Sequence, residues 1–333
     1  QWLVAGLYKI FGPHLIISRL FMFITSIFSV IGLYHLLNTL FKNKLAACLS
    51  ATLFTFSPAF FYYAINPLPD NFSLATAIWG LALFYRYIES KNQWHFYLSA
   101  SLLTIATACK LPFILFFTLP GIYFLREIFL NNKRLNNFLS LAGMFCFSLI
   151  PMAWYLAVIP SWKGNGIVEG MTKNKSSWLQ IFDYIQHHII STLPELLTNY
   201  AGLPFFLIGI IYFFILKKYS SKKFLPIFTL FIAITSYFLF EINMIEKVHD
   251  YYLFPYYPLI FILINFGIIQ AFIIFNKKAL IYALIALSPI LCGLRMIGRW
   301  DTEKPGFNAD LLTYKNELRT AVPNNKLVVA GSD

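Results

Sequence analysis

Four long stretches of the chain contain no acidic or basic residue. No Asp, Glu, Lys or Arg occurs in residues 45–69, 135–162, 196–216 or 251–276. A helix needs about 17–25 mostly apolar residues to cross the hydrocarbon core of a bilayer. The composition agrees with a membrane protein, because 59% of the 333 residues are hydrophobic and 12% are charged. A soluble domain of this length carries far more charge.

We therefore predict an all-α, multi-pass membrane protein with about ten spans. The predicted spans are 15–41, 45–64, 72–88, 94–109, 111–129, 138–158, 202–216, 225–241, 254–275 and 279–298. Residues 94–129 are divided because one helix of that length would measure about 54 Å, too long for one bilayer. Lys110-Leu111-Pro112 lies in the middle of this stretch, and proline disfavours a continuing helix.

The basic residues behind the formal charge of +12 are distributed according to the predicted topology. Basic residues gather in every second loop: Lys42, Lys44, Arg86, Lys91, Arg126, Lys133, Arg134, Lys217, Lys218, Lys222, Lys223, Lys277 and Lys278. The loops between them are longer and hold fewer basic residues. The positive-inside rule places the basic loops in the cytoplasm. The charge is thereby explained without a nucleic-acid partner.

The composition changes after the last predicted span. Asn308 can cap a helix with Asp310 in its first turn, and "KLVVAG" at 326–331 is typical of a buried strand. We expect residues 1–298 to form the membrane domain and residues 299–333 to begin a soluble extracytoplasmic α/β domain. The first residue is Gln rather than Met, so we also expect the natural N-terminal part to be missing.

Ionisable residues near the outer ends of spans are candidate functional residues, because charge at membrane depth is costly. Asp70 stands directly before the span that begins at Phe72, either as a helix N-cap or as an outward-facing carboxylate. Lys110 lies between two spans, where it can hold a phosphate or extend to the interface. Arg19, one turn inside the first span, has the same two interpretations.

The segment "IEKVHDYYLFPYYPLIFIL" at 245–263 places several polar groups at the edge of a span. His249 can titrate near neutrality. Tyr251 and Tyr252 could belong to an aromatic belt, but a belt does not require charged residues beside it. We therefore count all three among the candidate site residues. The sequence shows no Cys or His spacing typical of a metal site, and it does not determine whether a divalent metal is needed.

Four segments resemble, in order, a family of bacterial membrane glycosyltransferases related to protein O-mannosyltransferases and to the aminoarabinose transferase of lipid A. "FGPHLIISRLF" is similar to the family's Gly…Arg-Leu entry to its second span. "SPAFFYYAINPLPDN" is similar to its Pro…Asp loop and "TACKLP" to its Lys-Pro turn. "HDYYLFPYYPLIFIL" resembles its H-x-YY/L…P…P segment, although Asp250 stands where the family often has Tyr.

The resemblance implies a GT-C fold in the bacterial inner membrane with an extracytoplasmic active site. Such enzymes move a sugar from a polyprenyl-phosphate donor to a glycolipid, glycan or protein acceptor. By this resemblance Asp70 matches the second acidic position, and Lys110, His249 and Tyr251 line the donor cavity, with Tyr252 and Arg19 beside them. The principal catalytic acid of the family would lie upstream of Gln1.

Two other functions remain open at this point. An O-antigen polymerase or ligase usually carries arginines in its large outer loop, whereas residues 159–201 contain three lysines and no arginine. A transporter or flippase of lipid-linked glycans should show broken helices and paired charges near the middle of the bilayer. The ionisable groups of this chain gather at one face instead.

The topology can be tested by cysteine labelling in a background without native thiols. We expect an impermeant reagent added outside the cell to label a cysteine at His249 and not one at Lys217. Labelling at Lys217 from outside would show that the topology is inverted.

Overall fold

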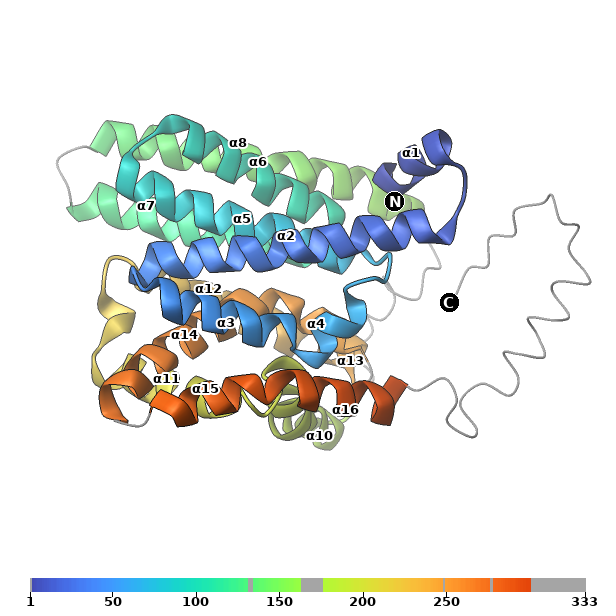
Figure 1. The fold of residues 1–333 in the computed structure, drawn as a ribbon. Coiled ribbons are helices and arrows are strands. Elements are labelled where there is room, and N and C mark those ends of the chain that lie inside the picture. Colours follow the sequence, from blue (N-terminus) through green and yellow to red (C-terminus); the bar gives the residue numbers. More distant parts are fainter. Residues whose placement is uncertain (1, 131–133, 163–175, 248, 276–277, 301–333) are drawn as a thin grey trace, which may run out of the picture.

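The computed structural model describes residues 2–130, 134–162, 176–247, 249–275 and 278–300. These residues form a bundle of helices, and no strand occurs among them (Figure 1). The predicted helix and strand at 308–331 lie outside the described residues, as does most of the predicted α/β domain.

The helices of the first half are α1 (Trp2–Phe11), α2 (Leu15–Phe41), α3 (Lys44–Thr55), α4 (Pro58–Tyr63), α5 (Pro69–Ser90), α6 (Gln93–Cys109), the 3-10 helix η1 (Leu111–Phe117), α7 (Thr118–Leu130) and α8 (Arg134–Val158). Those of the second half are η2 (Ile159–Trp162), α10 (Trp178–His187), the π-helix η3 (His188–Leu197), α11 (Leu203–Ile215), η4 (Lys218–Ser220), α12 (Leu225–Phe240), α13 (Ile242–Ile245), η5 (Asp250–Tyr256), α14 (Tyr257–Ile274), α15 (Lys278–Ala286) and α16 (Ser288–Trp300).

Five helical segments are long and apolar enough to cross a membrane: Leu15–Phe41, Leu111–Leu130, Leu135–Ser161, Asp250–Ile274 and Lys278–Gly298. Three further apolar helices, α3, α11 and α12, are shorter. Large apolar side chains such as Leu20, Phe23 and Ile24 of α2 are exposed on the surface of the bundle, as expected for contact with lipid. The described part of the chain is therefore that of an all-α multi-pass membrane protein, and the number of ten spans remains a prediction.

The predicted helix break at Lys110 is confirmed. α6 ends at Cys109, and Lys110 has an extended backbone with φ −148° and ψ 117°. Two other predicted helices, 45–64 and 279–298, are each divided in the structure. The divisions fall before Pro58 and before Ser288-Pro289, because proline lacks the N–H that would continue the helix but fits its first turn. The short helix α1 was not predicted.

The two ends of the bundle differ in composition. The turn between α2 and α3 and the connection between α11 and α12, which hold Lys42 and Lys217, lie at the same end (Figure 1). Helices α1, α4 and α13 lie at the opposite end. We call these two ends the basic end and the site end.

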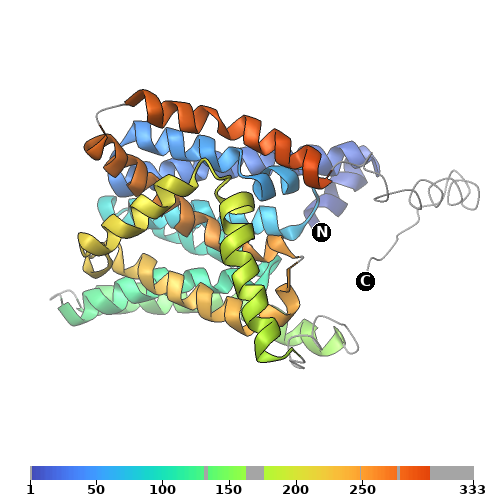
Figure 2. The same ribbon diagram turned by 90° about the horizontal axis from the view of Figure 1, so that it is seen from below.

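An amphipathic helix lies across the site end. It consists of α10 followed directly by η3, and it crosses the direction of the other helices (Figure 2). A capping box between Ser177 and Gln180 starts it. The Trp178 side chain is 86% exposed and that of Phe182 is 66% exposed. This arrangement agrees with a helix that rests in the membrane interface.

Helices α11 and α14 touch through their backbones at two glycines. A Cβ atom on Gly267 would lie 1.8 Å from the Phe205 carbonyl oxygen, and one on Gly209 would lie 2.0 Å from the Leu263 carbonyl oxygen. Small residues allow this close approach in membrane helix pairs. The crossing matters for the site because α11 and α14 also enclose the apolar cavity described below.

We expect Gly267→Ala to lower the stability of the bundle by about 1–3 kcal/mol, because the added methyl group must push two helix backbones apart. Thermal unfolding of the purified protein in detergent measures this effect. Gly121→Ala in α7 is the matched control, since nothing lies within 4 Å of a Cβ atom built there. Equal melting temperatures for the two variants would contradict the close crossing.

Candidate functional site

Asp70 lies in the first turn of α5. The N-cap of this helix is Leu68 and its first residue is Pro69, so the interpretation of Asp70 as an N-cap is wrong. Its side chain is 3% exposed in the structure. A buried carboxylate needs a strong partner, because an ionised group without one is very costly to remove from water.

Lys110 provides that partner. Its backbone N–H still closes α6 by donating to the Ala106 carbonyl, and its side chain then reaches α5, where the ammonium donates to Asp70 Oδ1. Both side chains of the pair are largely buried. The structure thus brings together two residues predicted for the site, and it joins the start of α5 to the junction of α6 and η1.

Two tyrosines of η5 cover the same ammonium group. Lys110 Nζ lies 4.1 Å from the ring centroid of Tyr252 and 4.8 Å from that of Tyr251. Aromatic faces attract cations at such distances. Lys110 is therefore held between a carboxylate and two aromatic rings, and all four of these side chains were predicted site residues.

His249 stands at the outer side of this cluster. It is exposed, and its Nδ1 lies 3.3 Å from the Tyr251 hydroxyl. The neighbouring Asp250 is buried and accepts a hydrogen bond of 2.8 Å from Tyr63 of α4. Asp250 therefore fixes η5 against α4, and the two tyrosines that follow remain directed at Lys110.

Arg19 is not brought into this cluster. It is exposed on α2, and in the described part of the chain no hydrogen bond, ion pair or ring contact joins it to the cluster. Its predicted role in donor binding gains no support from the structure.

Glu241 is a site residue that the sequence analysis missed. It follows the last residue of α12, is 3% exposed and lies near Tyr237. Helix α12 packs against η1 and η5, the elements that follow Lys110 and carry Tyr251 and Tyr252. One sequence signal was available, since Glu241 is the only charged residue in 224–245.

Several buried polar atoms near the site end have no hydrogen-bond partner among the described residues. They are Asn71 Oδ1 and Ser73 Oγ at the start of α5, and Glu241 Oε1 and Asn243 Oδ1 after α12. Buried polar atoms in proteins nearly always have partners. The hydrogen-bonding capacity of these atoms is therefore unused within the described part of the chain.

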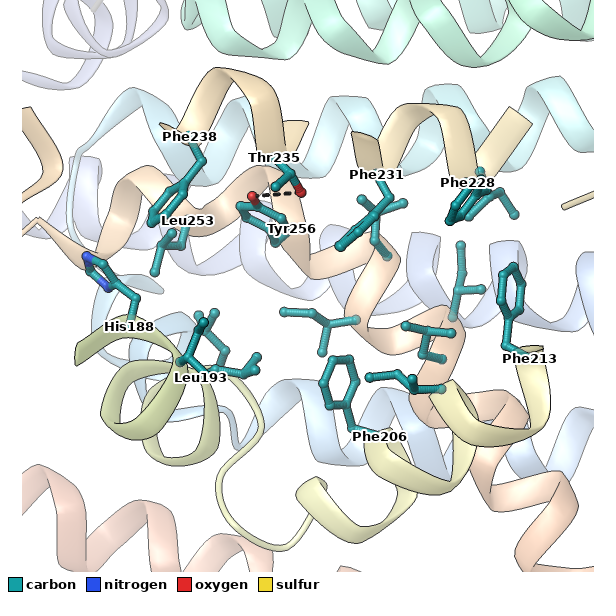
Figure 3. Close-up of a pocket in the computed structure, with 18 of the residues that line it drawn as sticks. His188, Leu193, Phe206, Phe213, Phe228, Phe231, Thr235, Phe238, Leu253 and Tyr256 are labelled. Atoms are coloured by element: carbon teal, nitrogen blue, oxygen red, sulfur yellow. Dashed lines mark hydrogen bonds between the residues drawn. The ribbon is translucent and has the colours of Figure 1, made fainter. Parts of the chain in front are cut away.

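The structure also contains an apolar cavity of about 460 Å³ (Figure 3). It is lined by α10, η3, α11, α12, η5 and α14. Figure 3 shows His188, Leu253 and Phe238 toward one end and Phe213 and Phe228 toward the other. Helix η5 contributes to both features, because Leu253 and Tyr256 line the cavity while Tyr251 and Tyr252 contact Lys110.

The few polar groups that line the cavity have partners within the protein. The Tyr256 hydroxyl donates to Thr235 Oγ1 at 3.2 Å. His188 Nδ1 lies 3.1 Å from Thr192 Oγ1, and its Nε2 lies 2.5 Å from the Glu246 carbonyl oxygen. Burial lowers the pKa of His188, which favours the neutral ring at neutral pH. The cavity thus offers an uncharged surface to an apolar ligand.

No group of three or more His, Cys, Asp or Glu side chains in the described part of the chain is placed to hold a metal ion. The charged groups of the site are instead Asp70, Glu241, Asp250 and Lys110.

The fold and the site define a multi-pass helical membrane protein with a polar cluster at one end of the bundle. Residues 1–155 match the model of the dolichyl-phosphate-mannose-protein mannosyltransferase family, which is of the GT-C type. This match confirms the family resemblance over these residues and indicates a mannosyltransferase-like membrane glycosyltransferase. Asp70 and Lys110 lie within the matched part, whereas Glu241 and η5 lie beyond it. No curated protein and no solved structure matches the chain.

The buried ion pair predicts a specific pattern of stabilities. Lys110→Met or Asp70→Asn should each lower the free energy of unfolding by about 3–5 kcal/mol, because the remaining partner loses its counterion. The double variant should lose less stability than the sum of the losses in the two single variants. Thermal or chemical unfolding of the wild type, the two single variants and the double variant measures these losses. Strictly additive losses would contradict a direct pair.

Proposed function

We propose that this protein is a glycosyltransferase that takes a sugar from a polyprenyl-phosphate donor and gives it to a glycolipid, glycan or protein acceptor. The observation that carries the proposal is the position of η5 between the cation Lys110 and the apolar cavity. A polyprenyl-phosphate sugar has a charged phosphate joined to a long apolar chain. Such a ligand needs these two environments side by side.

Lys110 and His249 would hold the donor phosphate. One N–H of the Lys110 ammonium donates to Asp70, and the group has two further N–H donors. In the transfer, the acceptor hydroxyl gives its proton to a carboxylate, and its oxygen bonds to the anomeric carbon of the sugar while the bond from that carbon to the phosphate oxygen breaks. The phosphate leaves with the bonding electrons, and a fixed cation stabilises the negative charge that develops on it.

Asp70 would hold the lysine in place and support the acceptor side of the site. Without Asp70, a lysine on an extended segment would lose its fixed position, and a fixed position is what makes a cation effective in stabilising the transition state. The tyrosines 251 and 252 would shield the ammonium from water, which strengthens its interaction with a phosphate.

The apolar cavity would accommodate part of the polyprenyl chain. Its volume of about 460 Å³ lies within the common range for ligand sites. A chain longer than the cavity would extend into the surrounding lipid, where it is equally well solvated. The donor could then enter from the bilayer without crossing a polar barrier.

The site would face the extracytoplasmic side of the bacterial inner membrane. This assignment rests on the basic loops at the opposite end of the bundle, which the positive-inside rule assigns to the cytoplasm. The transverse helix α10, with its exposed aromatic side chains, would then lie in the outer interface.

The proposal can be tested by sugar transfer in proteoliposomes. We expect the full-length protein, with the part upstream of Gln1, to transfer radiolabelled mannose from polyprenyl-phosphate mannose to an acceptor in a cell-envelope extract and to release polyprenyl phosphate. Lys110→Met should reduce the transfer rate about ten- to a hundredfold, the value of a charge-assisted hydrogen bond.

Lys91→Met is the matched control, because Lys91 also lies over two tyrosine rings but on a basic-end loop. It should transfer sugar at the wild-type rate. Translocation of the intact lipid-linked sugar without cleavage would instead identify a flippase and contradict the proposal.

A further inference from the structure

Glu241 is a buried acid that the proposed phosphate site does not use. Lys110 already has Asp70 as its direct counterion, so Glu241 is not required to neutralise it. A carboxylate that served only the fold would be expected to have partners for both of its oxygens, since an unsatisfied buried acceptor is costly. Glu241 Oε1 has none among the described residues.

The surroundings of Glu241 fix where this oxygen lies. Tyr237 lies one turn earlier in the sequence, near the carboxyl group. Helix α12, which Glu241 follows, packs against η1 and η5, and α5, which carries Asp70, packs against the same two elements. Glu241 and Asp70 therefore lie on elements that converge on Lys110 and Tyr252.

The chemistry of the free oxygen limits what it can bind. A carboxylate oxygen accepts hydrogen bonds, and a carboxylate repels the phosphate of a donor. The part of a lipid-linked sugar that lies next to the phosphate and carries hydrogen-bond donors is the sugar itself.

We propose that Glu241 binds a hydroxyl group of the donor sugar through Oε1. The inference rests on the proposed function and deepens it, because it assigns the sugar-binding side of the site to the end of α12. A site that hydrogen-bonds a hydroxyl group rejects analogues that lack it. Glu241 thereby contributes to the choice of sugar.

The experiment compares the binding of two kinds of lipid to the purified full chain in detergent. The probes are polyprenyl phosphate and the same lipid carrying mannose, glucose or 4-amino-arabinose. Binding to the wild type first identifies the sugar that binds most tightly. Glu241→Ala should then weaken binding of that sugar-bearing lipid at least tenfold without weakening the binding of bare polyprenyl phosphate.

Two further variants make the result specific. Lys110→Met should weaken the binding of both kinds of lipid, because Lys110 contacts the phosphate that they share. Glu241→Gln keeps an oxygen acceptor in a side chain of nearly the same size. This variant should therefore also lose affinity only for the sugar-bearing lipid, and it should lose less than Glu241→Ala does. If Glu241→Ala does not fold, the selective loss in Glu241→Gln decides the matter.

The possible failures are distinguishable. If the wild type binds neither kind of lipid, the proposed function is wrong and this inference fails with it. A second outcome is that both lipids bind to the wild type, while the Glu241 variants bind both as the wild type does or lose affinity for both equally. The proposed function then stands, and the assignment of Glu241 to the sugar is overturned.

Discussion

The buried ion pair between Asp70 and Lys110 is the interaction on which the site end of the bundle depends. It joins the first turn of α5 to the extended residue that separates α6 from η1. Neither charge could be buried at that depth alone, because the cost of removing an isolated charge from water is too high. The pair therefore permits a cation to lie beneath the tyrosines of η5, where a charged ligand can approach it.

Helix η5 turns this local arrangement into a site for an amphiphilic molecule. Asp250 secures its start against Tyr63 of α4, and the following tyrosines contact Lys110. The next turn of the same helix lines the apolar cavity with Leu253 and Tyr256. The polar cluster and the apolar cavity are thus parts of one element, and a ligand bound to one lies beside the other.

Much of this organisation could be predicted from particular residues. Uncharged runs predict the spans, Lys110-Leu111-Pro112 predicts the break between α6 and η1, and the order of short motifs predicts that Asp70, Lys110 and Tyr251 belong to one site. Glu241 was missed because a single acid at the end of an apolar helix has many explanations until the contacts of its side chain are known. The cavity could not be predicted, because its phenylalanines and leucines cannot be distinguished in the sequence from those that face lipid.

The most direct measurement of the central claim is the binding of polyprenyl phosphate compared with that of uncharged polyprenol of the same length. If Lys110 recognises the donor phosphate, native mass spectrometry of the wild-type protein should show a clear preference for the phosphate, and Lys110→Met should remove that preference while both lipids still bind. Equal binding of the two lipids to the wild type, or an unchanged preference in Lys110→Met, would contradict the account.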